Sequence, residues 1–140
     1  MGQKTGYLPG AFDMFHIGHL NIIRRARAAC DRLVVGVVTD EVMLQSKGKP
    51  PVVPFAERLE IVSCIVGVDE AVADLSSDKL VMWRSLHFDM VFKGDDWRGT
   101  PKGDRLERDL GGVGVEVVYF PYTTQTSSTL LRRWLAAAAS

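Results

Sequence analysis

The sequence is short of several features that would define a functional class. Lys plus Arg number 17 and Asp plus Glu number 17, so the formal net charge of the 140 residues is zero. Without an overall positive field we expect no nucleic-acid partner, and any polyanion site must be a local cluster of cations. No apolar run approaches the roughly 20 residues that span a bilayer, and the N-terminus lacks an apolar signal core. We therefore expect a cytoplasmic protein without membrane insertion.

Cysteine is also scarce. Cys30 and Cys64 are the two cysteines of the chain, and neither has a CxxC partner. Two thiols alone cannot build a structural zinc site. Both lie in apolar helical patterns, which predicts buried, unreactive thiols in a reducing compartment.

Apolar patterning supplies the fold class. β-branched runs, typical of buried strands, alternate with segments of helical periodicity. Strands are expected at 5–10, 31–40, 70–75, 89–94 and 115–121, and helices at 17–30, 53–68, 76–88, 103–112 and 127–139. This alternation predicts a single domain over residues 1–140, an α/β fold with a doubly wound, mostly parallel five-stranded sheet and helices on both faces.

In such sheets the ligand lies beyond the carboxyl ends of the strands. The loops to inspect are therefore 10–18, 39–50, 93–103 and 120–128, and they hold the unusual polar residues of the chain. We expect the second of these, "DEVMLQSKGKPP", to be a flexible segment that carries Lys47 and Lys49.

Two histidines three positions apart, His16 and His19, stand in "GAFDMFHIGH" between a strand and a helix. They could be metal ligands, core residues or parts of a phosphate site. A metal needs a third ligand, and Asp13 is the one nearby carboxylate. Both histidines share the first helical turn, where backbone N–H groups and the helix dipole favour an anion. The pattern therefore favours a phosphate site, with no protein side chains assigned to a metal.

"GAFDMFHIGH" resembles the HxGH motif of the nucleotidyltransferase superfamily. The similarity continues through "LVVGVVTDEVMLQSKGK", "PFAERLEIVSCIVGVDEAV", "VFKGDDW" and "YTTQTSSTLLR", covers nearly the whole chain, and matches most closely the small cytidylyltransferases that act on glycerol 3-phosphate. The resemblance implies a Rossmann-like sheet of order 3-2-1-4-5, CTP and a small phosphorylated acceptor as substrates, Mg²⁺ entering with the triphosphate, and a homodimer.

The resemblance also assigns roles residue by residue. It makes His16, His19 and Lys47 catalytic, with Lys49 a second candidate for the lysine. Acceptor contacts are implied for Lys47, Arg58, Trp97 and Tyr122. Nucleotide contacts are implied for Gly10, Ala11, Phe12, Gly18, Asp95, Asp96, Trp97, Thr123, Ser127, Ser128 and Thr129. Tyr122 replaces a family arginine, which weakens the case for the usual acceptor, and Ala11 replaces a hydroxyl residue.

Several of these residues also fit plain structural roles. Asp95 and Asp96 suit a turn, Trp97 a partly buried anchor, and Ser127 and Ser128 a helix N-cap. If the site is catalytic, an acceptor phosphate attacks the α-phosphorus in line and expels pyrophosphate, which needs positioning and charge neutralisation rather than a covalent intermediate. Transfer to another small phosphate or phosphonate, adenylyl transfer from ATP to a sugar phosphate, and a nucleotide-binding module without turnover are the alternatives.

Overall fold

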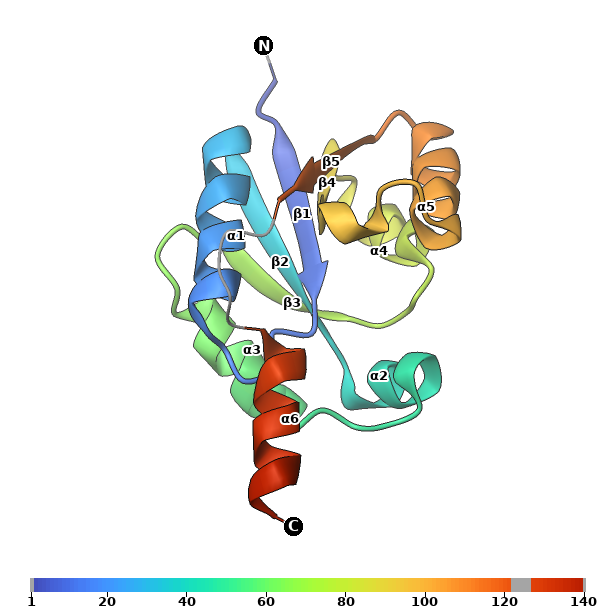
Figure 1. Ribbon diagram of the computed structural model, residues 1–140. Helices are drawn as coiled ribbons and strands as arrows, with labels where there is room; N and C mark the ends of the chain where they lie inside the picture. Colours follow the sequence, from blue (N-terminus) through green and yellow to red (C-terminus); the bar gives the residue numbers. More distant parts are fainter. Residues whose placement is uncertain (1, 122–126, 140) are drawn as a thin grey trace.

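Five parallel strands form one central sheet in the computed structural model, which describes residues 2–121 and 127–139 (Figure 1). The strands are β1 (Thr5–Gly10), β2 (Arg32–Val38), β3 (Glu70–Asp74), β4 (Met90–Gly94) and β5 (Glu116–Phe120). Their order is β3-β2-β1-β4-β5, and every neighbouring pair is parallel. The expected fold class and strand order are confirmed. The order reverses between β1 and β4, which is where such sheets bind ligands.

In the described part of the chain, six helices connect and cover the strands: α1 (Ile17–Ala29), α2 (Asp40–Lys47), α3 (Phe55–Ser63), α4 (Lys79–Leu86), α5 (Pro101–Gly111) and α6 (Ser128–Ala138). A 3-10 turn, η1 (Asp95–Trp97), follows β4. The N-caps of α4 and α5 are Asp78 and Thr100, each of which accepts a backbone N–H bond through its side chain. The cap of α4 is therefore not one of the serines expected there.

The two faces of the sheet carry separate hydrophobic cores, because successive strand residues point to opposite sides. Leu8, Val35 and Phe92 belong to the core under α1 and α3. Their chain neighbours Tyr7, Val34 and Val91 belong to the core under α4 and α5. The strands are thus buried on both faces, as their continuous apolar runs predict.

The segment after β2 is a helix, so the expectation of a flexible loop there is wrong. Thr39 caps α2 by accepting the Val42 N–H at 3.3 Å, and Asp40 and Glu41 complement the helix dipole in its first turn. Gly48 ends the helix in the left-handed conformation, with φ of 75°. Lys47 therefore stands at the end of a short helix, and Lys49 beyond it.

The prediction that both thiols are buried is also wrong. Cys64 is exposed, and Cys30 is partly buried with its thiol donating to the Ala26 carbonyl at 3.2 Å. Both are free. Within the described part of the chain, no helix has the length and apolar character needed to cross a bilayer.

Candidate functional site

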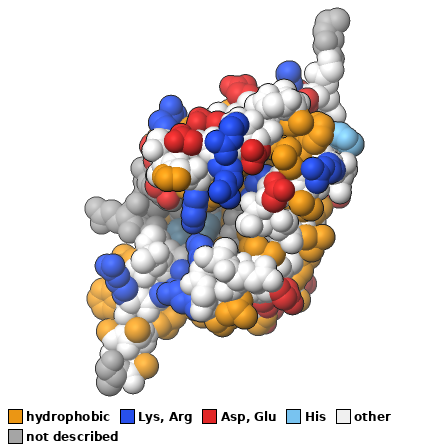
Figure 2. Space-filling view, turned by 90° about the vertical axis from the view of Figure 1, so that its right-hand side faces the viewer, with side chains coloured by type: hydrophobic (Ala, Val, Ile, Leu, Met, Phe, Trp, Pro, Cys, Tyr) orange, Lys and Arg blue, Asp and Glu red, His pale blue; other side chains and the backbone are white. Residues whose placement is uncertain are grey.

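Two adjoining cavities open at the carboxyl ends of β1 and β4. The histidine cavity, of about 330 Å³, is lined by residues of the α1 and α6 N-terminal turns, among them His16, His19 and Ser127. The α4–α5 cavity, of about 920 Å³, extends between α2, α4 and α5. The two share six lining residues, namely Pro9, Gly10, Ala11, Lys47, Lys93 and Trp97. Lys and Arg side chains gather around a hollow in this face of the molecule, with histidine visible inside it (Figure 2).

The two histidines cap α1 in a reciprocal arrangement. The Nδ1 atom of His16, the N-cap residue, accepts the Gly18 N–H at 3.0 Å. The Nδ1 atom of His19 accepts the His16 N–H at 3.1 Å. The rings lie 4.0 Å apart between centroids. This geometry is a capping box in which histidine takes the places usually held by Ser or Thr and by Glu or Gln.

The caps fix the state of both rings. A nitrogen that accepts a hydrogen bond carries no proton, so each neutral ring carries its proton on Nε2. Burial lowers the pKa of His16. Burial and the neighbouring His16 lower the pKa of His19 to about 4, against the opposing effect of Asp13. The site therefore offers two neutral Nε2–H donors at pH 7, suited to phosphoryl oxygens.

Asp13 is buried and braces the loop that carries the histidines. Its carboxylate accepts the Val52 and Val53 N–H groups, both at 2.8 Å, and the Arg132 Nη2–H at 2.7 Å. Burial acts to raise the Asp13 pKa, but these backbone bonds and Arg132 hold that pKa below its ordinary value. Its carbonyl also accepts the Ser128 hydroxyl at 2.7 Å. Asp13 thus ties the motif loop to α6 and to the segment before α3.

Arg58 lies inside the protein, which corrects its expected contact with the acceptor. Its side chain is 0% exposed and it lines neither cavity within the described residues. The guanidinium donates to the carbonyls of Val53 at 2.8 Å and of Ala11 and Val38 at 2.7 Å, and to Asp40 at 2.6 Å. Arg58 therefore positions the ends of β1 and β2 and the start of α2 instead of meeting a ligand.

The segment after β4 holds Trp97 between two lysines. The Lys93 ammonium lies 3.8 Å from the centroid of the Trp97 ring, and that of Lys102 lies 5.9 Å from it. The Trp97 backbone is packed against Gly103, where a Cβ would come within 1.9 Å of the Trp97 carbonyl oxygen. A glycine is therefore required there to bring the turn and α5 together.

The cavities bring together most of the residues expected in the site. Gly10, Ala11, Lys47 and Trp97 line both, and the histidine cavity adds Phe12, His16, Gly18, His19, Asp96, Ser127, Ser128 and Thr129. Among the described residues, Asp95 and Lys49 line neither. Thr123 and Tyr122 fall outside the described residues.

Two lysines of the site were not singled out from the sequence. Lys93 is the last residue but one of β4 and directly precedes the "GDDW" segment, and Lys79 begins α4 and lines the α4–α5 cavity. Burial, then Lys79 and Lys47, lower the pKa of Lys93 to about 7, while Asp96 and Asp74 act in the other direction. A lysine at the end of a buried strand is the signal that would have indicated Lys93. The sequence around Lys79 gives no comparable indication. Lys79 lies at the cavity only because the order of the strands places the start of α4 there.

No group of three or more His, Cys, Asp or Glu side chains in the described ranges could hold a metal ion. Mg²⁺ bound to a nucleotide usually keeps phosphate and water oxygens as most of its ligands.

Comparisons with known proteins identify the family of this chain. Residues 7–134 match the cytidylyltransferase-like family model, and the chain belongs to that family. It is 41% identical over 102 residues to the ethanolamine-phosphate cytidylyltransferase of Arabidopsis thaliana, covering 69% of this chain and 24% of that protein. It is 33% identical over 134 residues to the bifunctional protein HldE of Acidiphilium cryptum, covering 94% of this chain and 28% of that protein. The chain thus spans about a quarter of the length of these relatives.

The fold has solved counterparts as well. The lipopolysaccharide core biosynthesis protein from Thermoplasma volcanium superimposes with a TM-score of 0.73 at 23% identity, over 89% of this chain and 100% of that one. At this identity the likeness concerns the fold alone.

Proposed function

We propose that this chain transfers the cytidylyl group of CTP to the phosphate of a small phosphorylated alcohol and releases pyrophosphate. The observation that carries the proposal is the convergence of two neutral histidine donors, Lys47 and two helix N-termini on the histidine cavity. Glycerol 3-phosphate is the acceptor that the sequence motifs favour, and the product would be CDP-glycerol.

In the proposed reaction an oxygen of the acceptor phosphate attacks the α-phosphorus of CTP, and the bond from that phosphorus to the bridging oxygen of the β-phosphate breaks. The electron pair leaves with pyrophosphate. No side chain needs to remove a proton, because a phosphomonoester is already ionised near pH 7. The protein's task is to align the two phosphates and stabilise the developing charge.

Each part of the site has a place in this scheme. The Nε2–H groups of His16 and His19 donate to the α-phosphoryl and bridging oxygens, while the Lys47 ammonium holds the acceptor phosphate or the α-phosphate. The helix start at Ser127–Thr129 receives the outgoing pyrophosphate, since a helix N-terminus favours anions. When bound to the triphosphate, Mg²⁺ would neutralise further negative charge on the phosphates.

The nucleoside is proposed to lie against the segment that follows β4. Asp96 and Trp97 line the histidine cavity, and the backbone of Gly10, Ala11 and Phe12 faces the same space. Backbone groups of this segment would form hydrogen bonds with the edge of the base. The N-terminal end of α1, at Gly18, would lie close to the phosphates.

Phosphoethanolamine is the second candidate acceptor. Two relatives carry that specificity in their names: the plant protein above and the Dictyostelium discoideum ethanolamine-phosphate cytidylyltransferase, which is 44% identical over 118 residues. Adenylyl transfer from ATP to a sugar phosphate is a further outcome that the same experiment distinguishes.

The test is pyrophosphate release with each of the four nucleoside triphosphates and Mg²⁺, against glycerol 3-phosphate, phosphoethanolamine and a sugar 1-phosphate. We expect turnover that requires CTP and a phosphomonoester together. Equal or faster turnover with ATP would refute the cytidylyl assignment. Absence of pyrophosphate release with every pair would leave a nucleotide-binding module.

We also propose a homodimer. The stretch from Ile61 to Val72 leaves Ile61 44% and Val66 94% exposed, which supports an apolar interface there. Sedimentation velocity of the wild type and of Val66→Asp tests this, and a wild-type monomer at micromolar concentration would contradict it.

A further inference from the structure

The α4–α5 cavity is strongly basic. Six of its lining side chains are cationic, from four separate elements, and two are carboxylates. The cations are Lys47, Lys79, Lys93, Lys102, Arg105 and Arg108. Such an excess of one charge in a cavity of about 920 Å³ raises the local concentration of anions.

Each of the two carboxylates in this cavity has a partner nearby, and the partner of Asp109 is Arg108, one of the six cations. Asp78 accepts the Leu80 N–H at 3.0 Å as the cap of α4, and Asp109 lies 3.9 Å from Arg108. The Arg105 side chain makes no hydrogen bond or ion pair with any other residue in the ranges 2–121 and 127–139. Its guanidinium charge is therefore not neutralised by a neighbouring carboxylate.

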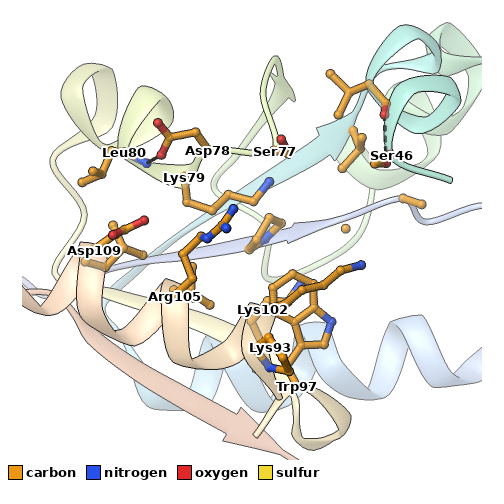
Figure 3. Close-up of a pocket in the computed structure, with 18 of the residues that line it drawn as sticks. Ser46, Ser77, Asp78, Lys79, Leu80, Lys93, Trp97, Lys102, Arg105 and Asp109 are labelled. Carbon is orange, nitrogen blue, oxygen red and sulfur yellow. Dashed lines mark hydrogen bonds between the residues drawn. The ribbon is translucent and has the colours of Figure 1, made fainter. Parts of the chain in front are cut away.

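Lys79 is held in place at the same end of the cavity. Its ammonium donates to buried Asp74 at 2.9 Å and to the Ser76 carbonyl at 3.2 Å, and Asp74 also accepts the Tyr7 hydroxyl at 2.7 Å. Because an ammonium has three N–H donors, one is left for a ligand. The Lys79 ammonium and the Arg105 guanidinium reach into the cavity from α4 and α5, whereas Lys93 and Lys102 lie beside Trp97 (Figure 3).

The cavity therefore has two cationic ends. Lys47 and Lys93 stand where it joins the histidine cavity. Lys79, whose charge is paired with buried Asp74, and Arg105 stand at the α4–α5 end. Burial is the main cause of the lowered pKa of Lys93; Lys79 and Lys47 lower it further, while Asp96 and Asp74 act to raise it.

We infer that the acceptor is a small phosphomonoester that carries a second anionic group, in place of the glycerol 3-phosphate that the sequence motifs favour, with the reacting phosphate at Lys47 and Lys93 and the second group at Lys79 and Arg105. The inference rests on the proposed function, since it takes the α4–α5 cavity as the acceptor side. A guanidinium can pair with a carboxylate or phosphate through two parallel hydrogen bonds, which suits Arg105 to this task. An acceptor with an ammonium group at that end would be repelled by the positive charge there.

The experiment uses three ligands that share a phosphomonoester and differ in the remote group: 3-phosphoglycerate with a carboxylate, glycerol 3-phosphate with a hydroxymethyl group, and phosphoethanolamine with an ammonium. Dissociation constants are measured by calorimetry without CTP, at fixed ionic strength. We expect 3-phosphoglycerate to bind about tenfold more tightly than glycerol 3-phosphate, as one additional charge-assisted pair allows. Phosphoethanolamine should bind most weakly.

Two variants distinguish a specific contact of Arg105 with the second anionic group from a general effect of positive charge. Arg105→Gln should reduce the tenfold ratio to less than about threefold. Arg84→Gln removes an exposed arginine of α4 that lines neither cavity, and should keep the full ratio. The inference is overturned if 3-phosphoglycerate binds no more tightly than glycerol 3-phosphate, or if the ratio survives in Arg105→Gln. Because no turnover is involved, failure of CTP-dependent pyrophosphate release is a separate result that bears on the proposed function.

Discussion

Arg132 donates from Nη2 to the carboxylate of Asp13 at 2.7 Å, joining residues 119 positions apart. The contact docks α6 against the loop that presents His16 and His19. Since Asp13 is 1% exposed and also accepts two backbone N–H groups, its removal leaves several donors unsatisfied.

We expect Asp13→Asn to lower the free energy of unfolding by about 2 kcal/mol, because the amide cannot accept from Val52, Val53 and Arg132 together. Urea unfolding measures the change. Arg132→Gln should cost less, and the double variant should cost less than the sum of the two. Additive changes would contradict coupling between α6 and the motif loop.

His16 has a structural and a chemical role that a pair of variants can separate. In His16→Asn the side-chain oxygen can replace Nδ1 as the cap of α1, because Asn is among the best N-cap residues. The Nε2–H donor is lost. We therefore expect unchanged unfolding by urea, but a fall in kcat/KM of about 10²–10³, the usual effect of removing one donor to the transition state.

His16→Gln is the matched control, because its amide nitrogen reaches closer to the place of Nε2 while the cap is disturbed. It should retain more activity than His16→Asn and unfold at lower urea. The reverse order for both measurements would contradict the assignment of Nε2 as the working atom.

Acid should destabilise the protein through His19. Its pKa is about 4 in the folded state, while an unfolded histidine takes up a proton near 6.5. Between these values the unfolded state binds more protons, so the free energy of unfolding falls as pH falls, by at most ~1.4 kcal/mol per pH unit. Urea titrations from pH 7 to 4.5 measure the slope. The slope should be smaller in His19→Asn; an equal slope would assign the effect to other groups.

The charge on Lys93 should control acceptor binding near neutral pH. With a pKa of about 7, its ammonium is lost as pH rises through 7, and the KM for the acceptor should then increase. A phosphomonoester, with a second pKa near 6, is already dianionic in this range and contributes little. Burial lowers the pKa of the amine most; Lys79 and Lys47, which face it, lower that pKa further, and Asp96 and Asp74 raise it.

Lys93→Arg keeps a charge throughout and should give a KM that changes little from pH 6.5 to 8.5. Lys93→Met should start with a higher KM and be equally flat. Steady-state kinetics with CTP in excess measures all three proteins. A wild-type profile that Lys93→Arg reproduces would contradict the prediction.

Local patterns determined much of this protein. Runs such as "DRLVVGVVTD" indicate doubly buried strands because only both-face burial favours an uninterrupted β-branched run, and these strands lie where the runs predict. The HxGH motif and the "GDDW" segment likewise indicate the family, because the two motifs in this order along the chain are more specific than either motif alone. Helix α2 was missed because its eight residues show no clear apolar period, and its stability comes from Thr39, Gly48 and tertiary contacts.

Only the tertiary structure decided what each charged side chain does. Arg58 and Lys93 are both cations near apolar segments in the sequence, yet four acceptors surround Arg58 while Lys93 lines both cavities beside Trp97. The use of Nδ1 by both histidines, and with it the direction of Nε2–H, likewise depends on backbone geometry. Sequence fixes which groups are present, but the fold sets their distances and their access to water, and these determine charge state and partner.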